Sequence, residues 1–289
     1  MDSDPEETVN RATNTNMESG GEVRRKSAED VEVDAGPGFC FKSALIRSSI
    51  PPQCLQENSG DGVTLGIDEA GRGPVLGPMV YGGAFWSCSD DKEVSSMGFD
   101  DSKALTPAQR DGLFDRLEKT PQVGWVLRLI SAKELSSKMC RRTPYSLNAI
   151  SHDAAIEIIK SVQSAGVKIN EVFVDTVGDP SFYQKRLERE FASGIKFTVA
   201  KRADSLYKTV SAASILAKVT RDRILDKWQW SEPNLAVERT YGSGYPSDDR
   251  CKRWMEDSVD PVFGFPDICR FSWATTKEKL EKLGKRVEW

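Results

Sequence analysis

Histidine and paired cysteines are scarce in this chain. Its one histidine is His152, and its six cysteines are scattered without a Cys-x-x-Cys pair. Common zinc sites need several cysteine or histidine ligands at short spacing, so a zinc site is not expected. The scattered cysteines also favour a reduced compartment over a disulfide framework.

Long hydrophobic runs are absent as well. No stretch approaches the roughly 20 apolar residues of a transmembrane helix, and the first residues carry no apolar segment of a secretory signal. Hydrophobic residues make up 38% and charged residues 29% of the 289-residue chain, which is ordinary for a soluble protein with one sizeable core. We therefore expect no membrane partner.

The acidic charge is concentrated at the N-terminus. The net charge is −4, yet residues 1–36 hold ten acidic and four basic side chains, so the rest of the chain carries +2. We predict a disordered acidic tail over 1–36 and a linker of uncertain packing over 37–60. The basic run at 24–26 is a weak import motif, and solvated charge explains it as well. The mildly basic body is compatible with nucleic-acid binding.

Strand and helix patterns alternate from Val63 onward. Antiparallel strands followed by strand–helix alternation predict an α/β fold, with a mixed sheet flanked by helices. We expect strands over 63–67, 80–86, 122–130, 171–175 and 195–200. We expect helices over 146–165, 180–191, 210–228 and 274–285, one that Thr106 caps and one that runs from a Ser247 cap to residue 256.

The most informative run is GIDEAGRGPVLGP at 66–78. Asp68 and Glu69 stand at the end of an apolar strand, just before a turn that carries Arg72. Gly71 and Gly73 allow the backbone to approach another group closely. A solvated surface turn explains the acid pair alone, so a metal site requires further carboxylates nearby.

Two more acids follow strands that are expected to end at the same edge. Asp175 terminates one apolar strand, and Asp204 lies shortly after another. A strand-end turn and a helix N-cap explain each of them singly. Together with Asp68 and Glu69 they would repel one another unless a cation lies between them. Mg²⁺ suits such oxygen ligands, and two ions about 4 Å apart support phosphodiester hydrolysis.

Six runs, including part of the one above, occur in order between about residues 63 and 273. They are DEAGRG at 68–73, DSK at 101–103, FVDTVG at 173–178, SAASI at 211–215, YGSGYP at 241–246 and PVFGFP at 261–266. On these runs the chain resembles the type 2 ribonuclease H family, and within it the catalytic chains of the eukaryotic enzymes. One departure is at Ser146, where related sequences often have asparagine.

The resemblance implies an RNase H-like fold and an endonuclease. The expected catalytic domain spans 61–245, and a helical C-terminal extension over 246–289 would dock partner subunits. Members hydrolyse the RNA strand of RNA–DNA hybrids and nick duplex DNA 5′ of a single embedded ribonucleotide, as in ribonucleotide excision repair and RNA primer removal. They leave 3′-hydroxyl and 5′-phosphate ends. A heterotrimer with two non-catalytic subunits and a nuclear location are implied too.

The resemblance also assigns roles to residues. Asp68, Glu69, Asp175 and Asp204 would hold two Mg²⁺ or Mn²⁺ ions, and a metal-bound water would attack, so His152 is taken as structural. Gly71, Arg72 and Gly73 would contact the ribose 2′-hydroxyl, and Tyr245 would pack against the next deoxyribose. Lys103 would bind a phosphate, and the side-chain amide of Asn148 would contact the substrate. Further basic residues could extend a phosphate track: Lys201, Arg202, Lys208, Arg221 and Arg223.

Simpler explanations stay open for several of these residues. Tyr245 is compatible with a turn aromatic, and Lys103 with a solvated turn lysine. Trp273 and Trp289 suit a docking surface, but burial in the chain's own core explains them as well. Two rival functions also remain: a non-catalytic nucleic-acid-binding module, and another two-metal nuclease on the same fold.

Overall fold

The computed structural model describes residues 24–25, 42–58, 60, 62–99, 105–191, 194–230 and 239–286. The expected disordered tail at 1–36 therefore lies outside the described residues, apart from 24–25. Lys103 and Trp289 lie outside them too. In the described part of the chain, no helix combines the length and the apolar content needed to cross a membrane.

A mixed sheet forms the centre of the molecule, with strand order β1-β2-β5-β4-β3-β6-β7. The β2–β5–β4–β3 part is antiparallel, and β3, β6 and β7 are parallel. β2 to β7 form six of its strands, and the two-residue β1 extends the edge beside β2. The strands are β1 (Arg24–Arg25), β2 (Ala44–Arg47), β3 (Val63–Ala70), β4 (Met79–Ser87), β5 (Gly124–Ile130), β6 (Ile169–Asp175) and β7 (Lys196–Ala200).

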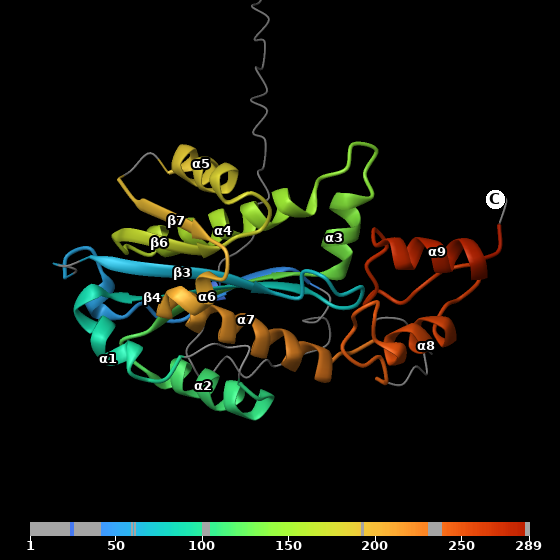
Figure 1. Cartoon of the computed structure of the whole chain (residues 1–289), viewed down its shortest axis with the longest axis horizontal. Coiled ribbons are helices and arrows are strands. Elements are labelled where there is room, and N and C mark those ends of the chain that lie inside the picture. Colours follow the sequence, from blue (N-terminus) through green and yellow to red (C-terminus); the bar gives the residue numbers. More distant parts are fainter. Residues whose placement is uncertain are drawn as a thin grey trace, which may run out of the picture.

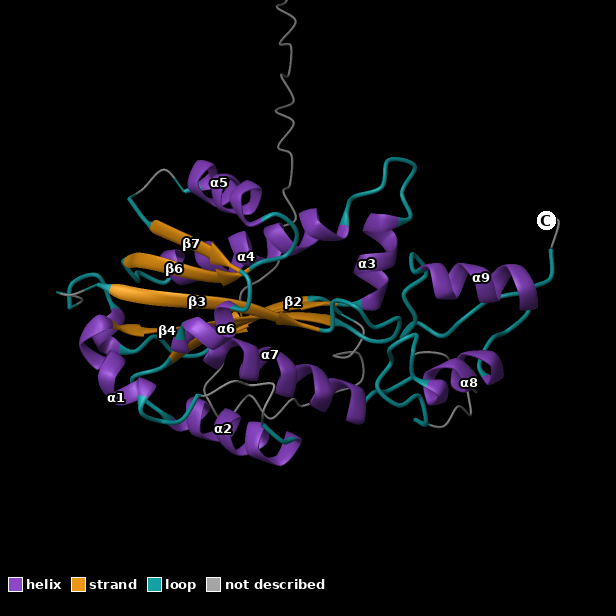
Figure 2. Ribbon diagram, in the orientation of Figure 1, coloured by secondary structure: helices purple, strands orange, loops and turns teal. Residues whose placement is uncertain are grey.

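Helices cover both faces of this sheet (Figure 1). One hydrophobic cluster joins α1, α2 and α7 to one face, and a second joins α3, α4 and α5 to the other. α8 and α9 lie beyond one end of the sheet, as Figure 2 shows. The helices are α1 (Asp91–Ser95), α2 (Pro107–Lys119), α3 (Ala132–Met139), α4 (Leu147–Ser164), α5 (Pro180–Glu190), α6 (Ala203–Leu206), α7 (Lys208–Asp226), α8 (Asp249–Asp257) and α9 (Ala274–Leu283).

This arrangement confirms the predicted fold class, a mixed sheet flanked by helices with helical C-terminal segments. Thr106 caps α2 as expected, with its hydroxyl accepting the Gln109 amide N–H. The cap predicted at Ser247 is wrong. Asp248 precedes α8 instead, and its carboxylate accepts the Arg250 N–H at 2.9 Å, so it satisfies one of the free N–H groups at the helix start.

Close approach between the sheet and α7 depends on small residues. A Cβ on Gly66 would lie 2.2 Å from the Thr209 backbone, and one on Gly82 would lie 2.4 Å from the Ala213 carbonyl oxygen. Glycine on the strands and the buried Ser-Ala-Ala-Ser run at 211–214 on α7 remove this clash. The consequence is that α7 side chains reach the end of β3, where the acid pair stands.

Candidate functional site

The acid pair belongs to β3 itself, which corrects the prediction that it follows the strand. β3 continues to Ala70 because β4 pairs with it over its full length. Successive strand residues point to opposite faces. Asp68 therefore shares the α7 face with Gly66, and Glu69 shares the α4 face with Ile67. The two carboxylates thus flank the end of one strand from opposite sides.

Asp175 and Asp204 meet through α6. An Asp175 carboxylate oxygen accepts the Ala203 N–H at 2.7 Å, which ties the end of β6 to the first residue of this one-turn helix. Arg202 adopts φ 56°, the left-handed conformation that turns the chain into α6. Asp204 follows inside the helix and is 4% exposed. Both acids therefore stand at the edge predicted for them.

Burial and mutual repulsion raise the pKa of the acid pair. Asp68 is 5% exposed, and burial raises its pKa to about 7, with Asp175 adding to the rise. Burial, together with Asp68 and Asp175, raises the pKa of Glu69 well above its usual value. Lys218 lowers both values and donates to Ser214 at 2.8 Å. An ammonium group on α7 therefore offsets part of this repulsion.

The groups that could bind a metal ion at this edge are carboxylate oxygens. Within the described residues, Glu69 Oε2 is buried without a hydrogen-bond partner. A buried carboxylate oxygen in this condition is costly, and a bound cation would satisfy it. Among the described residues, no three or more acidic, histidine or cysteine side chains already form a closed metal site. The edge thus fits a hard cation, and the carboxylate oxygens would have to move closer together to bind it.

A fully buried arginine fixes the glycine turn beside the acids. Arg270 is 0% exposed, and its guanidinium donates to the carbonyl oxygens of Gly71 at 2.6 Å, Arg72 at 3.2 Å and Gly77 at 2.8 Å. Trp273 adds a bond from its indole N–H to the Gly73 carbonyl at 3.1 Å. The turn therefore owes its shape to residues near the end of the chain.

The Arg72 side chain lies on the other side of this turn, against the start of α4. Its guanidinium donates to Asn148 Oδ1 and Ser151 Oγ. A Cβ on Gly178 would lie 2.9 Å from Asn148 Nδ2. The structure thus brings Arg72 and Asn148 together with the loop that follows Asp175.

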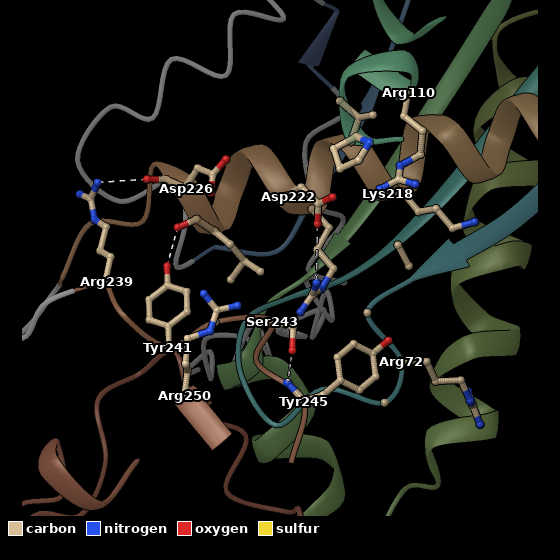
Figure 3. Close-up of a pocket in the computed structure, with 18 of the residues that line it drawn as sticks. Arg72, Arg110, Lys218, Asp222, Asp226, Arg239, Tyr241, Ser243, Tyr245 and Arg250 are labelled. Atoms are coloured by element: carbon tan, nitrogen blue, oxygen red, sulfur yellow. Dashed lines mark hydrogen bonds and ion pairs between the residues drawn. The ribbon is translucent and has the colours of Figure 1, made fainter. Parts of the chain in front are cut away.

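Tyr245 covers the opposite edge of the turn. A Cβ on Gly73 would lie 3.1 Å from the Tyr245 ring, so a larger residue would push the ring back by a few tenths of an ångström. The ring is 43% exposed and faces a pocket of about 940 Å³ (Figure 3). Among the four acids, Glu69 lines this pocket. One cavity therefore joins an acid, the glycine turn and Tyr245.

Other predicted site residues have structural roles instead. Arg221 is 6% exposed and donates to the carbonyls of Leu76 and Pro78, so its place in a phosphate track is wrong. Arg223 pairs with the Asp111 and Asp115 carboxylates of α2, and its place in the track stays a prediction.

The structure also shows the positions of Ser146 and His152, at the start of α4 and within it. Ser146 caps this helix by accepting the Ala149 N–H at 3.1 Å. His152 is buried and stacks on Tyr183 with ring centroids 3.8 Å apart, which agrees with a structural role.

Trp273 is partly buried and packs against both hydrophobic clusters, which agrees with burial in the chain's own core.

Sequence reasoning missed Lys218, Ser214 and Arg270. Ser214 and Lys218 are one helical turn apart on the α7 face that meets β3, so helical spacing from the small-residue run pointed to them. Arg270 gave no signal of its own, because arginine is rarely buried without a carboxylate partner.

Comparisons with known proteins agree with this geometry. Residues 65–276 match the family model described as ribonuclease HII. The A subunit of ribonuclease H2 from Neurospora crassa is 46% identical over 90% of this chain and 86% of its own, and that from Homo sapiens is 45% identical over 84% and 80%. The crystal structure of ribonuclease H2 from Pyrococcus horikoshii superimposes with a TM-score of 0.64 and 32% identity, over 76% of this chain and 98% of its own.

Proposed function

The chain belongs to the ribonuclease HII family, and from this premise we propose that it nicks duplex DNA 5′ of single embedded ribonucleotides and hydrolyses the RNA strand of RNA–DNA hybrids. Ribonuclease H activity itself follows from family membership. The finer proposal is carried by one observation: the acid pair of β3 runs directly into a clamped glycine turn that faces the same pocket as Tyr245.

Divalent cations fit the carboxylate edge. Asp68, Glu69, Asp175 and Asp204 would hold two Mg²⁺ or Mn²⁺ ions, which lower the pKa of bound water and stabilise the leaving oxygen when bound. The raised pKa values of Asp68 and Glu69 support this assignment, because both reflect buried like charges that a cation would neutralise. Lys218 would add positive charge beside the substrate phosphate.

The glycine turn suits recognition of the ribose 2′-hydroxyl. Arg270 and Trp273 occupy the carbonyl oxygens of Gly71, Arg72 and Gly73 from behind. Among the described residues, the amide N–H groups of Arg72 and Gly73 have no hydrogen-bond acceptor. These two donors are available to a hydroxyl oxygen, which DNA lacks at this position. Tyr245 would then pack against the following deoxyribose.

Partner chains and a nuclear location are part of the proposal. The relatives are named as one lettered component of ribonuclease H2, which supports a multi-subunit complex with two accessory chains, as the resemblance implies. Co-purification of the tagged chain and microscopy of a fluorescent fusion test these two statements. A monomer in extracts, or exclusion from the nucleus, would contradict them.

A nicking assay with Mg²⁺ tests the central proposal. The substrate is an end-labelled DNA duplex with one ribonucleotide, beside an all-DNA control, and the protein is assayed alone and with its accessory chains. We expect one nick 5′ of the ribonucleotide, absent from the all-DNA duplex and from Asp68→Asn. Binding without any nick would favour the non-catalytic module, and nicking of the all-DNA duplex would favour another nuclease.

A further inference from the structure

The pocket continues past Tyr245, away from the acid pair. Its far wall consists of residues 239–243 and Arg250 from the first turn of α8 (Figure 3). At about 940 Å³ the pocket is near the top of the range for small-molecule sites, so it has room beyond the reacting nucleotide. This extension has its own charge pattern.

Asp248 supports the far wall and is fully engaged in doing so. One of its carboxylate oxygens accepts both the Ser243 N–H and the Ser243 hydroxyl at 2.8 Å, and the other accepts the Arg250 N–H at 2.9 Å. These hydrogen bonds lower the pKa of Asp248 to about 2. Its closest approach to the Arg250 guanidinium is 3.8 Å, beyond hydrogen-bond distance. The carboxylate thus orients the loop and only weakly offsets the charge of Arg250.

Arg250 extends from α8 into the pocket between Tyr241 and Ser243 (Figure 3). Its side chain is 69% exposed. A Cβ on Gly242 would lie 2.4 Å from Asp248 Oδ2 and 3.1 Å from the Arg250 Cβ, so glycine is required for the loop to close onto this helix. The packing of this loop therefore fixes where the Arg250 side chain leaves the wall.

The opposite wall carries mixed charge. Its lining contains three acids and three bases: Asp111, Asp222 and Asp226 with Arg110, Lys218 and Arg221. In the described lining, the far wall carries Arg239 and Arg250 and no acid. A nucleic-acid backbone entering this extension is therefore attracted mainly by the far wall.

We propose that Arg250 binds a backbone phosphate of the DNA segment that follows the ribonucleotide on its 3′ side. The proposal rests on the proposed function, in which Tyr245 packs against the first deoxyribose after the ribonucleotide, so that the wall beyond Tyr245 faces the next nucleotides. The planar guanidinium matches phosphate oxygens in a two-pronged contact. Arg250 thereby extends recognition from the ribonucleotide to the DNA that follows it.

Two substrates that differ only in this segment test the proposal. Both are DNA duplexes with one ribonucleotide. In the long substrate the cut strand continues well beyond it, and in the short one that strand ends after a single deoxynucleotide. We expect Arg250→Gln to lower kcat/KM about tenfold on the long substrate and to leave the short one unchanged, since one charged hydrogen bond is lost. Arg253→Gln, on the same helix but outside the pocket lining, is the matched control.

The outcomes separate the two proposals. Nicking of the short substrate by the unaltered protein supports the proposed function whatever Arg250 does. Equal losses on both substrates, or no loss on either, would overturn the Arg250 assignment. Equilibrium binding is a readout independent of cleavage: Arg250→Gln should reduce the salt dependence of binding to the long substrate by about one phosphate contact, and an unchanged salt dependence would count against it.

Discussion

Replacing Arg270, the buried arginine behind the glycine turn, should reduce activity strongly while the protein stays folded. Arg270→Met keeps the length and apolar stem of the side chain but removes all three bonds to the carbonyls of Gly71, Arg72 and Gly77. The turn would then lose the donors that define its position relative to Glu69 and Tyr245.

The stability cost follows from those bonds. Losing three hydrogen bonds at about 1 kcal/mol each destabilises the fold by about 3 kcal/mol, since the relief of a buried charge offsets the larger value expected for charged donors. For a domain of this size that lowers the melting temperature by roughly 6–12 °C. Because typical domains have about 5–15 kcal/mol of stability, the variant should remain folded at 25 °C.

The activity cost should be larger. A displacement of about 1 Å in a positioning element costs on the order of 100-fold in rate, so kcat/KM for the single-ribonucleotide duplex should fall at least that far. Nicking kinetics and thermal unfolding are measured on the same preparation. Arg270→Lys should recover part of the stability and little of the rate, because one ammonium cannot span three separate carbonyls.

Arg128→Met provides the matched control. Arg128 is a second buried arginine, 9% exposed on β5, where it binds Glu134 and Glu157 rather than the carbonyls of the turn. It should lose comparable stability and keep its kcat/KM below the melting transition. Full activity of folded Arg270→Met would refute the positioning role of Arg270.

Three further predictions concern the site and its support. Gly73→Ala should displace the Tyr245 ring, which lies 3.1 Å from the new Cβ, and should reduce single-ribonucleotide nicking more than cleavage of long hybrids. Gly112→Ala, whose new Cβ has no atom within 4 Å, should leave both activities unchanged. Equal losses on both substrates in Gly73→Ala would count against the role of the Tyr245 ring. Asp68→Asn should abolish cleavage and stabilise the metal-free protein. The Asp68 pKa is raised to about 7, so native stability falls as pH rises from about 4 to 7, and thermal unfolding in chelator should show the gap between the two proteins widening over that range. The pKa of His152 is lowered to about 4, so its contribution is present above about 6.5 and lost as pH falls towards 4; His152→Asn should flatten that part of the unfolding curve, and an unchanged curve would refute it.

The central elements were predictable because local and tertiary signals agree there. α4 and α7 show helical periodicity over many residues, and β4 is a buried apolar strand of nine residues. β2 and α6 were missed for a physical reason. β2 is a four-residue strand of mixed polarity near the sheet edge, and α6 is a single turn that depends on the bond from Ala203 to Asp175.

The candidate site was predictable only in part. Sequence adjacency identified Asp68 and Glu69, and strand order placed Asp175 near them. Adjacency did not indicate that the first two point to opposite faces, because the strand was expected to end before them. The support from Arg270 was out of reach, since no periodic pattern connects a turn to a side chain far along the chain.

The bond from Arg270 to Gly71 joins residues 199 positions apart. At a synthesis rate of roughly 5–20 residues per second, that interval lasts about 10–40 s. During this interval the growing chain has Asp68 and Glu69 but not the clamp that shapes the turn beside them, and Asp175 and Asp204 are added before Arg270. A chain interrupted between Asp204 and Arg270 would contain all four acids and lack the three hydrogen bonds that hold the glycine turn.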